Sequence, residues 1–396
     1  MIKSELTTVD IKESENLSGK QLFEYAKELT DGKISKIAII CDNAPIKSKD
    51  VLIDELKELC TTQVFDKVQP NPRVVDIMDM IGEIEKPDCI IGIGGGSTLD
   101  SAKAVAMLCA NGGNLDEYLG NNPKRKIEKQ SLPLILLPTT GGTGSEVTKV
   151  GVYTATNGRK FTLGSILMQA RLAILNASFL LFAPPSLCAS TGLDALDHAL
   201  ESIWNKNRNE TTIKEAQTAA IEVLGVLEDV YDSAVKIKET KKTDETDLNL
   251  RKKMLAASCK AGIAFSVTGT AAGHSLSFVL SENWHVPHGT ACAFTLQGVF
   301  DLAIQDEDVK KDLLPIAKHF FPSVDDESRL IEALKNKIKD LMKKMRQPEN
   351  FKSIGVDFKK EDIDEEFNRA FDDPKMWNQV PKATKENIYP ILEALC

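Results

Sequence analysis

Strand-like apolar runs alternate with helix-like segments through the first half of the chain, and this alternation limits the folds open to it. Short apolar runs occupy residues 36–41, 63–68, 88–96 and 131–140. Stretches with helical spacing stand between them, for example "RVVDIMDMIGEIEK". Such a regular alternation is typical of a parallel sheet with helices on both faces. We therefore predict a Rossmann-like α/β domain at the N-terminal side.

The second half of the chain has a different pattern. The paired prolines of "FAPPSL" mark a break, after which long helical patterns dominate and strand signals nearly vanish. A chain of 396 residues is also too long for one ordinary core. We predict an α/β domain over residues 1–185 and an all-helical domain over residues 186–396. The charged run 236–253 is expected to be solvated.

Charge and composition narrow the function. A net charge of −9 argues against nucleic acid or an anionic membrane as the main partner. No apolar run approaches the length of a membrane span, and the N-terminal segment lacks the apolar core of a secretion signal. The eight scattered cysteines form no CxxC pair and fit reduced, buried thiols. We expect a soluble cytoplasmic protein that acts on a small molecule.

Two glycine-rich turns each follow a buried apolar run. "GGGS" at 94–97 leads into a helix, and "TTGGTGS" at 139–145 sets hydroxyl groups beside glycines. Glycines let the backbone approach a phosphate, and a helix N-terminus offers free N–H groups. Ser97 can serve as the N-cap of this helix or bind a phosphate oxygen. The GxGxxG fingerprint is not met, and each turn alone could be an ordinary tight turn, but together they favour a nucleotide diphosphate.

Asp42 ends the first of these apolar runs. An acidic residue there can accept hydrogen bonds from a ribose hydroxyl and would repel a 2′-phosphate, which favours NAD(H) over NADP(H). An aspartate in an ordinary turn is the alternative interpretation.

Four of the five histidines gather in two short segments. Asp194 and His198 are spaced i, i+4, which places both on one face of a helix. His274, His285 and His288 lie in "GHSLSFVLSENWHVPHG", where a proline and a glycine beside His288 could turn it back toward His274. A carboxylate with imidazoles suits a divalent metal such as Fe(II) or Zn(II). The spacing does not select which histidines bind it.

The chain resembles the iron-containing (group III) alcohol dehydrogenase family in the order and separation of four motifs: "GGGSTLDSAKAV", "LPTTGGTGSEVT", "TGLDALDHALE" and "GHSLSFVLSENWHVPHG". The resemblance covers nearly the whole chain. It implies a nucleotide-binding N-terminal domain, a metal-binding helical C-terminal domain and an active site in the cleft between them. It also implies NAD(H), a divalent metal (Fe(II) first, Zn(II) or Mn(II) as alternatives) and a homodimer or larger homo-oligomer.

The same resemblance carries individual roles onto this sequence. As the metal ligands through which catalysis acts it implies Asp194, His198, His274 and His288, and not His285. For the cofactor it implies Gly95, Gly96 and Ser97 at the pyrophosphate, Thr139, Thr140 and Thr143 lining the site, Asp42 at the ribose and Lys160 nearby.

One position departs from the family pattern. Many members carry a second histidine four residues after the first ligand of the last motif, and here that position is Phe278. The motif therefore does not identify the group that moves the proton in place of this histidine. His285, Ser277 and bound water are the alternatives.

These parts predict a metal-dependent, NAD(H)-linked alcohol dehydrogenase or aldehyde reductase, because a divalent metal polarises an aldehyde oxygen and the nicotinamide carries the hydride. The motif variants resemble the branch that reduces short anionic aldehydes such as sulfoacetaldehyde or phosphonoacetaldehyde. A generalist short-chain alcohol dehydrogenase is the main alternative, and an enzyme like glycerol dehydrogenase or dehydroquinate synthase is a more remote one. Trp204, Asn205, Trp284 and His285 either shape a small pocket or simply pack.

Overall fold

The computed structural model describes residues 2–396 and divides into two compact units. The first holds residues 2–182 together with Asp244–Leu255, and the second holds Ala183–Thr243 together with Ala256–Cys396. Part of the charged run 236–253 thus returns to the first unit. There Asp247 and Arg251 are each 1 % exposed, so the expectation of a wholly solvated run is wrong. The division into residues 1–185 and 186–396 stays a prediction.

A six-stranded parallel sheet forms the centre of the first unit. Its spatial order is β1 (Asp10–Glu13), β8 (Leu172–Leu175), β5 (Leu134–Pro138), β4 (Cys89–Gly94), β2 (Lys36–Cys41) and β3 (Thr61–Phe65). A separate antiparallel pair joins β6 (Val150–Thr154) to β7 (Lys160–Gly164). The four predicted apolar runs correspond to β2, β3, β4 and β5.

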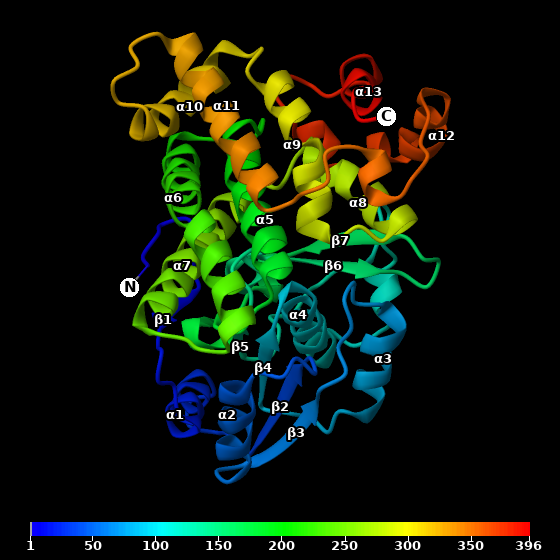
Figure 1. Ribbon diagram of the computed structural model, residues 1–396. Coiled ribbons are helices and arrows are strands. Elements are labelled where there is room, and N and C mark those ends of the chain that lie inside the picture. The colour runs from blue at the N-terminus through cyan, green and yellow to red at the C-terminus, as the bar shows by residue number, and fades with distance from the viewer. Residues whose placement is uncertain (1) are drawn as a thin grey trace. The chain divides into compact units, whose positions relative to one another are not determined.

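Helices cover both faces of this sheet. Figure 1 shows α1 (Gly19–Leu29) and α2 (Lys47–Lys57) on one side and α3 (Val74–Glu83) and α4 (Gly96–Asn111) on the other. Both faces of strand β2 are buried as a result. Ala38 and Ile40 join the core under α3 and α4, while Ile37 and Ile39 point to the opposite face and are equally buried. Burial on both faces is the reason that these strands are continuous apolar runs rather than alternating ones.

The chain changes direction across the sheet between β2 and β4. From β2 it moves outward to β3, then returns to β4 and continues through β5 to β8. A ligand in an open α/β sheet binds outside the carboxyl ends of the strands at such a switch point. The turns that follow β2 and β4 are those that contain Asp42 and the three glycines 94–96.

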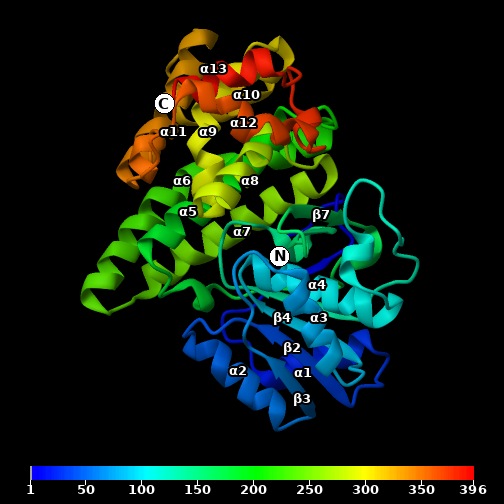
Figure 2. The same cartoon turned by 90° about the vertical axis from the view of Figure 1, so that its right-hand side faces the viewer.

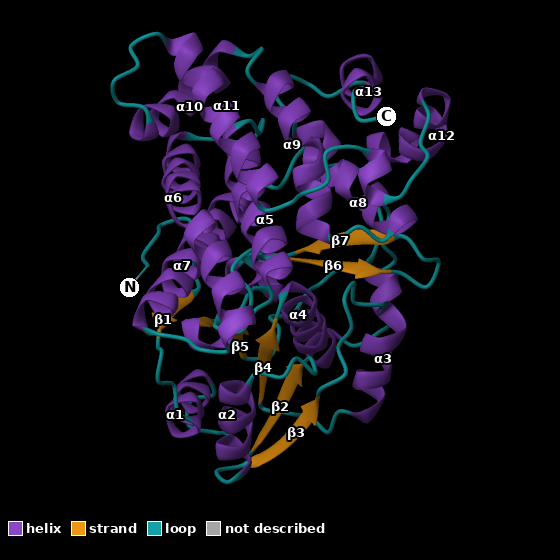
Figure 3. Cartoon of the chain, viewed as in Figure 1, coloured by secondary structure: helices purple, strands orange, loops and turns teal. Residues whose placement is uncertain are grey.

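The second unit consists of helices, as Figures 2 and 3 show. They are α5 (Pro185–Ile203), α6 (Glu210–Thr240), the later part of α7 (Glu245–Thr268), α8 (Ala272–Trp284), α9 (His288–Ala303), α10 (Glu307–Phe320), α11 (Glu327–Lys344), α12 (Ile363–Phe367) and α13 (Lys385–Glu393). Every residue of α5 from Gly192 to Ile203 is buried. A helix that is buried all round is the centre of its unit.

The fold class, an α/β unit with a parallel sheet and a helical unit, is confirmed. All eight cysteines are free, as expected, but only five are buried: Cys60 and Cys109 are half-buried and Cys396 is exposed. Among residues 2–396, no single helix has the length and apolar character needed to cross a membrane, and only the pair α7 and α8, bent by 105°, passes that test jointly.

Candidate active site

The candidate metal centre is built around α5. Asp194 and His198 lie one turn apart on this helix, and their side chains are 3 % and 6 % exposed. Nδ1 of His198 is 3.9 Å from Oδ1 of Asp194. The buried setting of α5 therefore places a carboxylate and an imidazole in the interior of the helical unit.

Two glycines bring α8 and α9 directly onto α5. A Cβ atom at Gly289 would lie 2.0 Å from the carbonyl oxygen of Ser190 and 2.9 Å from Cβ of Asp194. A Cβ atom at Gly273 would lie 3.0 Å from a carboxylate oxygen of Glu201. The residues next to these glycines are His274 and His288, so the close helix packing delivers both imidazoles to Asp194.

Three of the four predicted ligands, Asp194, His274 and His288, bring donor atoms within 4.8 Å of one another, whereas His198 is not in that group. Oδ1 of Asp194 is 3.6 Å from Nε2 of His274 and 3.7 Å from Nε2 of His288. Nε2 of His274 is also 2.9 Å from Nε2 of His198. Nitrogen and oxygen ligands at about 2.1 Å from one divalent metal lie about 3.0–3.4 Å apart, so the separations of 3.6 and 3.7 Å would shorten by a few tenths of an ångström around a shared cation.

The chemistry of the cluster also fits a cation. Oδ1 of Asp194 is buried and has no hydrogen-bond donor among the described residues. Burial alone would raise the pKa of this carboxyl, but the imidazoles of His198, His288 and His274 hold it well below its usual range. A buried carboxylate that lacks a donor and is surrounded by imidazole nitrogens is the arrangement expected of a divalent metal site.

Two carboxylates on α5 lie behind His274. Nδ1 of His274 donates to Oε2 of Glu201 at 2.8 Å and is 3.2 Å from Oδ2 of Asp197. Glu201 also accepts from the backbone N–H groups of Ala271 and His274, at 2.5 and 3.2 Å. A carboxylate on Nδ1 fixes the tautomer and leaves Nε2 to face a metal. Burial and the charge of Glu201 raise the pKa of Asp197.

Sequence reasoning missed Glu201, Asp197 and Cys292. Cys292 lies on α9, is fully buried, and its Sγ is 3.8 Å from Nε2 of His288. One donor atom each from Asp194, His274, His288 and Cys292 lies within 4.8 Å of the others. The sequence did contain a signal for Cys292, since this residue follows His288 by one helical turn.

The structure distinguishes between His285 and Ser277, the two residues considered as replacements for the family histidine at position 278. His285 ends α8 in the left-handed conformation, with φ 55°, and its side chain is exposed. Ser277 lies inside the cluster, with Oγ 3.4 Å from Nδ1 of His288 and donating to the carbonyl of His274 at 2.8 Å. The ring of Phe278 lies beside His288, with centroids 6.2 Å apart. Of the two residues considered, Ser277 and not His285 therefore lies inside the cluster.

The tryptophans near the ligand motifs pack against other aromatic rings. Trp204 is fully buried against Phe300 at 5.9 Å between ring centroids, and Asn205 donates to the carbonyl of Gly269 at 3.1 Å. Trp284 packs against Phe351 and Phe358 at 5.6 and 5.4 Å.

In the first unit, the predicted cofactor residues lie at the carboxyl edge of the sheet. Asp42 accepts from the hydroxyl of Thr98 at 3.1 Å and from the N–H of Ala44 at 3.0 Å. A Cβ atom at Gly94 would lie 2.7 Å from Oδ2 of Asp42, so only glycine lets the two turns meet here. The turn after β4 therefore stands directly against the acidic residue after β2.

The start of α4 differs from the prediction in one respect. Gly95, not Ser97, is the N-cap, and α4 begins at Gly96. The hydroxyl of Ser97 instead accepts from the N–H of Asn71 at 3.1 Å. An N-terminus without a side-chain cap leaves its N–H groups for another partner, which is the arrangement that binds a phosphate.

The threonine-rich turn packs against this helix start. The N–H of Thr139 donates to the carbonyl of Gly94 at 3.0 Å, and a Cβ atom at Gly95 would lie 3.5 Å from Cγ2 of Thr140. A Cβ atom at Gly96 would lie 2.7 Å from Cγ2 of Thr143. Lys160 is the first residue of β7, in the separate strand pair.

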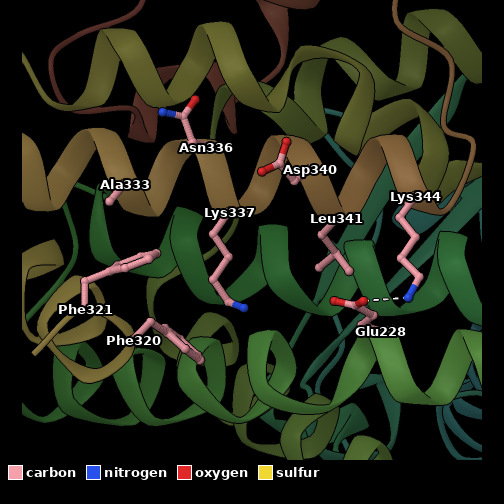
Figure 4. Close-up of a pocket in the computed structure, with 9 residues that line it drawn as sticks. All are labelled: Glu228, Phe320, Phe321, Ala333, Asn336, Lys337, Asp340, Leu341 and Lys344. Carbon is pink, nitrogen blue, oxygen red and sulfur yellow. Dashed lines mark hydrogen bonds and ion pairs between the residues drawn. The ribbon is translucent and has the colours of Figure 1, made fainter.

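One surface pocket is lined by residues of the helical unit alone. It is formed by α10, α11 and Glu228 of α6, and the ion pair between Lys344 and Glu228 lies at one end of it (Figure 4). None of the predicted site residues lines this pocket, and we assign it no catalytic role.

Comparisons with known proteins show the family of this chain. Residues 14–177 match the model of the iron-containing alcohol dehydrogenases, and residues 188–396 match the model of that family's C-terminal region. The chain is 31% identical over 333 residues to alcohol dehydrogenase 4 of Saccharomyces cerevisiae, covering 83% of this chain and 82% of the relative. It is 31% identical over 387 residues to the sulfoacetaldehyde reductase of Bilophila wadsworthia, covering 94% of both chains.

A solved structure gives the same fold. The sulfoacetaldehyde reductase of Bifidobacterium kashiwanohense, in complex with NAD+, aligns over 100% of this chain and 99% of its own, with a TM-score of 0.83 and 26% identity. The chain belongs to the iron-containing alcohol dehydrogenase family. It is an oxidoreductase of the alcohol dehydrogenase and aldehyde reductase type, and its family uses NAD(H) and a divalent metal.

Proposed function

We propose that this enzyme reduces short aldehydes that carry an anionic group, such as sulfoacetaldehyde or phosphonoacetaldehyde. In this proposal Asp194, His198, His274 and His288 hold the metal. The turns around Asp42, Gly95, Gly96 and Ser97 and the threonines 139, 140 and 143 hold NAD(H), with Lys160 nearby. The anionic end of the substrate binds Lys375.

The position of Lys375 is the observation that most directly supports the proposal. Its Nζ lies 3.8 Å from the ring centroid of Phe278, the residue that replaces the family's second histidine. The Lys375 side chain is 14 % exposed and pairs with Asp373 at 3.1 Å. An ammonium over an aromatic face and partly removed from water attracts an anion more strongly than a solvated one. The departure at Phe278 thus creates a support for a cation.

The position of Lys375 relative to the metal cluster supports the same conclusion. His288 is 37 % exposed, whereas Asp194 and His274 are 3 % and 4 % exposed, so the cluster opens to solvent at His288. Phe278 lies beside His288 on this open side. Lys375 is therefore one aromatic ring away from the point where a small substrate could enter. The likeness to the sulfoacetaldehyde reductase of Bilophila wadsworthia agrees with this choice.

When bound, the metal supplies Lewis-acid polarisation of an aldehyde oxygen and the dinucleotide supplies the hydride. The side chains of the protein orient the metal ligands and the substrate. Glu201 accepts from Nδ1 of His274 and so keeps Nε2 of that imidazole turned toward Asp194. Ser277 lies between His274 and His288 and can hold or pass a proton at Nδ1 of His288. Phe278 packs beside His288, and Lys375 orients the anionic end of the substrate.

The test is a comparison of two aldehydes in two variants. NADH oxidation is followed with sulfoacetaldehyde and with butanal in the metal-loaded enzyme, in Lys375→Gln and in Lys382→Gln, an exposed lysine of the same segment. We expect Lys375→Gln to lower kcat/KM for sulfoacetaldehyde by about tenfold, mostly through KM, because one charge-assisted contact is lost. Butanal turnover and the Lys382→Gln control should not change. An equal loss for both aldehydes, or a wild-type preference for butanal, would favour the generalist alcohol dehydrogenase instead.

A further inference from the structure

We infer that Cys292 is an additional ligand of the metal, so that a sulfur atom joins the carboxylate and imidazoles around it. This inference rests on the metal site of the proposed function and assigns to that site a donor that the family motif does not include. It concerns only α5, α8 and α9 of the helical unit.

The distances suit a shared cation. Sγ of Cys292 is 3.8 Å from Nε2 of His288, and the donor atoms of Asp194, His274, His288 and Cys292 all lie within 4.8 Å of one another. A sulfur at about 2.3 Å and a nitrogen at about 2.1 Å from one tetrahedral metal lie about 3.6 Å apart. Oδ1 of Asp194, which lacks a donor among the described residues, faces the same point.

The helix packing explains why the sulfur lies there. Cys292 follows His288 by four residues on α9, so both side chains leave the same face of that helix. Gly289, between them, lets this face approach α5 at Ser190 and Asp194. Cys292 is 0 % exposed, and its sulfur is enclosed with the cluster.

Other buried cysteines show what an ordinary packing thiol does here. Sγ of Cys188 donates to the carbonyl of Ala183 at 3.7 Å, and Sγ of Cys89 donates to the carbonyl of Ile90 at 3.6 Å. Both thiols contact backbone oxygens, whereas that of Cys292 contacts an imidazole nitrogen of a proposed ligand. The contact of Cys292 is therefore not the common one in this chain.

A thiolate changes what the site prefers. The thiol releases its proton to solvent as it binds, and the resulting sulfur donor is softer than nitrogen or oxygen. Such a donor favours Zn(II) and Co(II) over Mn(II) more strongly than an Asp/His set does. Together with Asp194, His274 and His288, Cys292 makes a group of four donors, and this group does not include His198.

The test uses Co(II) as the probe, because sulfur bonded to Co(II) gives a charge-transfer band in the near ultraviolet. The full-length protein is stripped with a chelator and titrated with Co(II), and absorbance is recorded along with bound cobalt. The wild type should develop the band up to one equivalent of Co(II). Cys292→Ser and Cys292→Ala should bind Co(II) about 10- to 100-fold more weakly and without the band. Cys188→Ser, another buried cysteine of the same unit, should keep the band.

The outcomes separate this inference from the proposed function. Wild-type protein that binds one equivalent of Co(II) without the band, or a band that persists in both Cys292 variants, overturns the role of Cys292 and leaves the metal site standing. Wild-type protein that binds no Co(II), Zn(II) or Fe(II) overturns both. Circular dichroism of each variant establishes that it is folded, and the serine variant keeps the size of the side chain, so a lost band in a folded serine variant supports the sulfur ligand.

Discussion

The two candidate sites of this enzyme are built in opposite ways. At the sheet edge of the first unit, polar groups bind one another: Asp42 is bonded by Thr98, and the hydroxyl of Ser97 by the N–H of Asn71. In the helical unit, ionisable groups crowd together and carboxylate oxygens of Asp194 and Asp197 lack hydrogen-bond donors. A large dinucleotide can be held by a turn that is stable without it. A small cation needs charges that are left uncompensated until it binds.

The largest effect should come from removing a charged donor. His274→Ala deletes the imidazole that contacts Asp194, His198 and Glu201 together. We expect aldehyde reduction to fall by at least about 1000-fold, since metal polarisation is worth several kcal/mol, while NADH binding stays unchanged. Metal content after dialysis, NADH fluorescence and NADH oxidation measure the three properties.

His319→Ala, at an exposed position of α10, is the matched control and should change none of them. If His274→Ala kept its metal and its turnover, the cluster would not be the catalytic centre, and the contrast between the two units would lose its basis.

Glu146 is the exception that sharpens the contrast, because it is a buried carboxyl in the first unit. Burial raises its pKa from 4.5 to about 7, and Oε1 has no hydrogen-bond partner among the described residues. Between these two pH values the folded chain keeps a proton that the unfolded chain loses. The free energy of unfolding therefore falls as pH rises through this window, and the full loss is present above it.

Glu146→Gln removes the ionisable group. We expect it to raise the free energy of unfolding by about 3 kcal/mol near pH 8, and by progressively less toward pH 5. Urea denaturation of both proteins at the two pH values measures the difference. A gain that does not depend on pH would show that Glu146 has the same pKa in the folded and the unfolded chain, which would contradict the raised pKa.

Glu201→Gln should weaken the metal site without removing a ligand. The amide no longer holds Nδ1 of His274 with a charge, so we expect metal affinity to fall by about 10- to 100-fold. Added metal should then restore turnover, which distinguishes a positioning residue from a ligand. Glu222→Gln, which alters an ion pair with Lys260 on the surface of the same unit, provides the control. Equal metal affinity in Glu201→Gln and the wild type would contradict this role.

Gly96→Ala should give the smallest effect, and only on the nucleotide side. The added Cβ would lie 2.7 Å from Cγ2 of Thr143 and force the two turns apart. We expect the KM for NADH to rise by about tenfold, with metal content unchanged. Gly82→Ala, where the new Cβ meets nothing within 4 Å, is the matched control. A fall in metal content with unchanged KM would reverse the assignment of the two units.

Much of this architecture was visible in the sequence because apolar runs bounded by turns report buried strands. The short edge strand β1 was not visible, since "DIKE" pairs with β8 on one side only and carries no apolar run. The strand pair β6 and β7 was missed for a related reason. β6 alternates between half-buried and buried positions, β7 has only half-buried and exposed ones, and neither is an apolar run.

The site residues also divide into those that the sequence pattern indicates and those that it does not. Asp194 and His198 could be paired from their helical spacing, and Cys292 and Glu201 lay within one turn of predicted ligands. Lys375 could not be foreseen, because only the folded chain brings it onto Phe278, far earlier in the sequence. Local periodicity therefore predicts neighbours on one helix, whereas contacts between distant segments depend on packing that the sequence pattern does not contain.

The most direct test of the account measures both sites in one preparation. The enzyme is stripped of metal with a chelator, and NADH binding and sulfoacetaldehyde reduction are recorded before and after adding one equivalent of Fe(II), Mn(II) or Zn(II). We expect the stripped enzyme to bind NADH with unchanged Kd and to reduce nothing, and at least one of these metals to restore reduction. Undiminished reduction by the stripped enzyme would contradict this expectation.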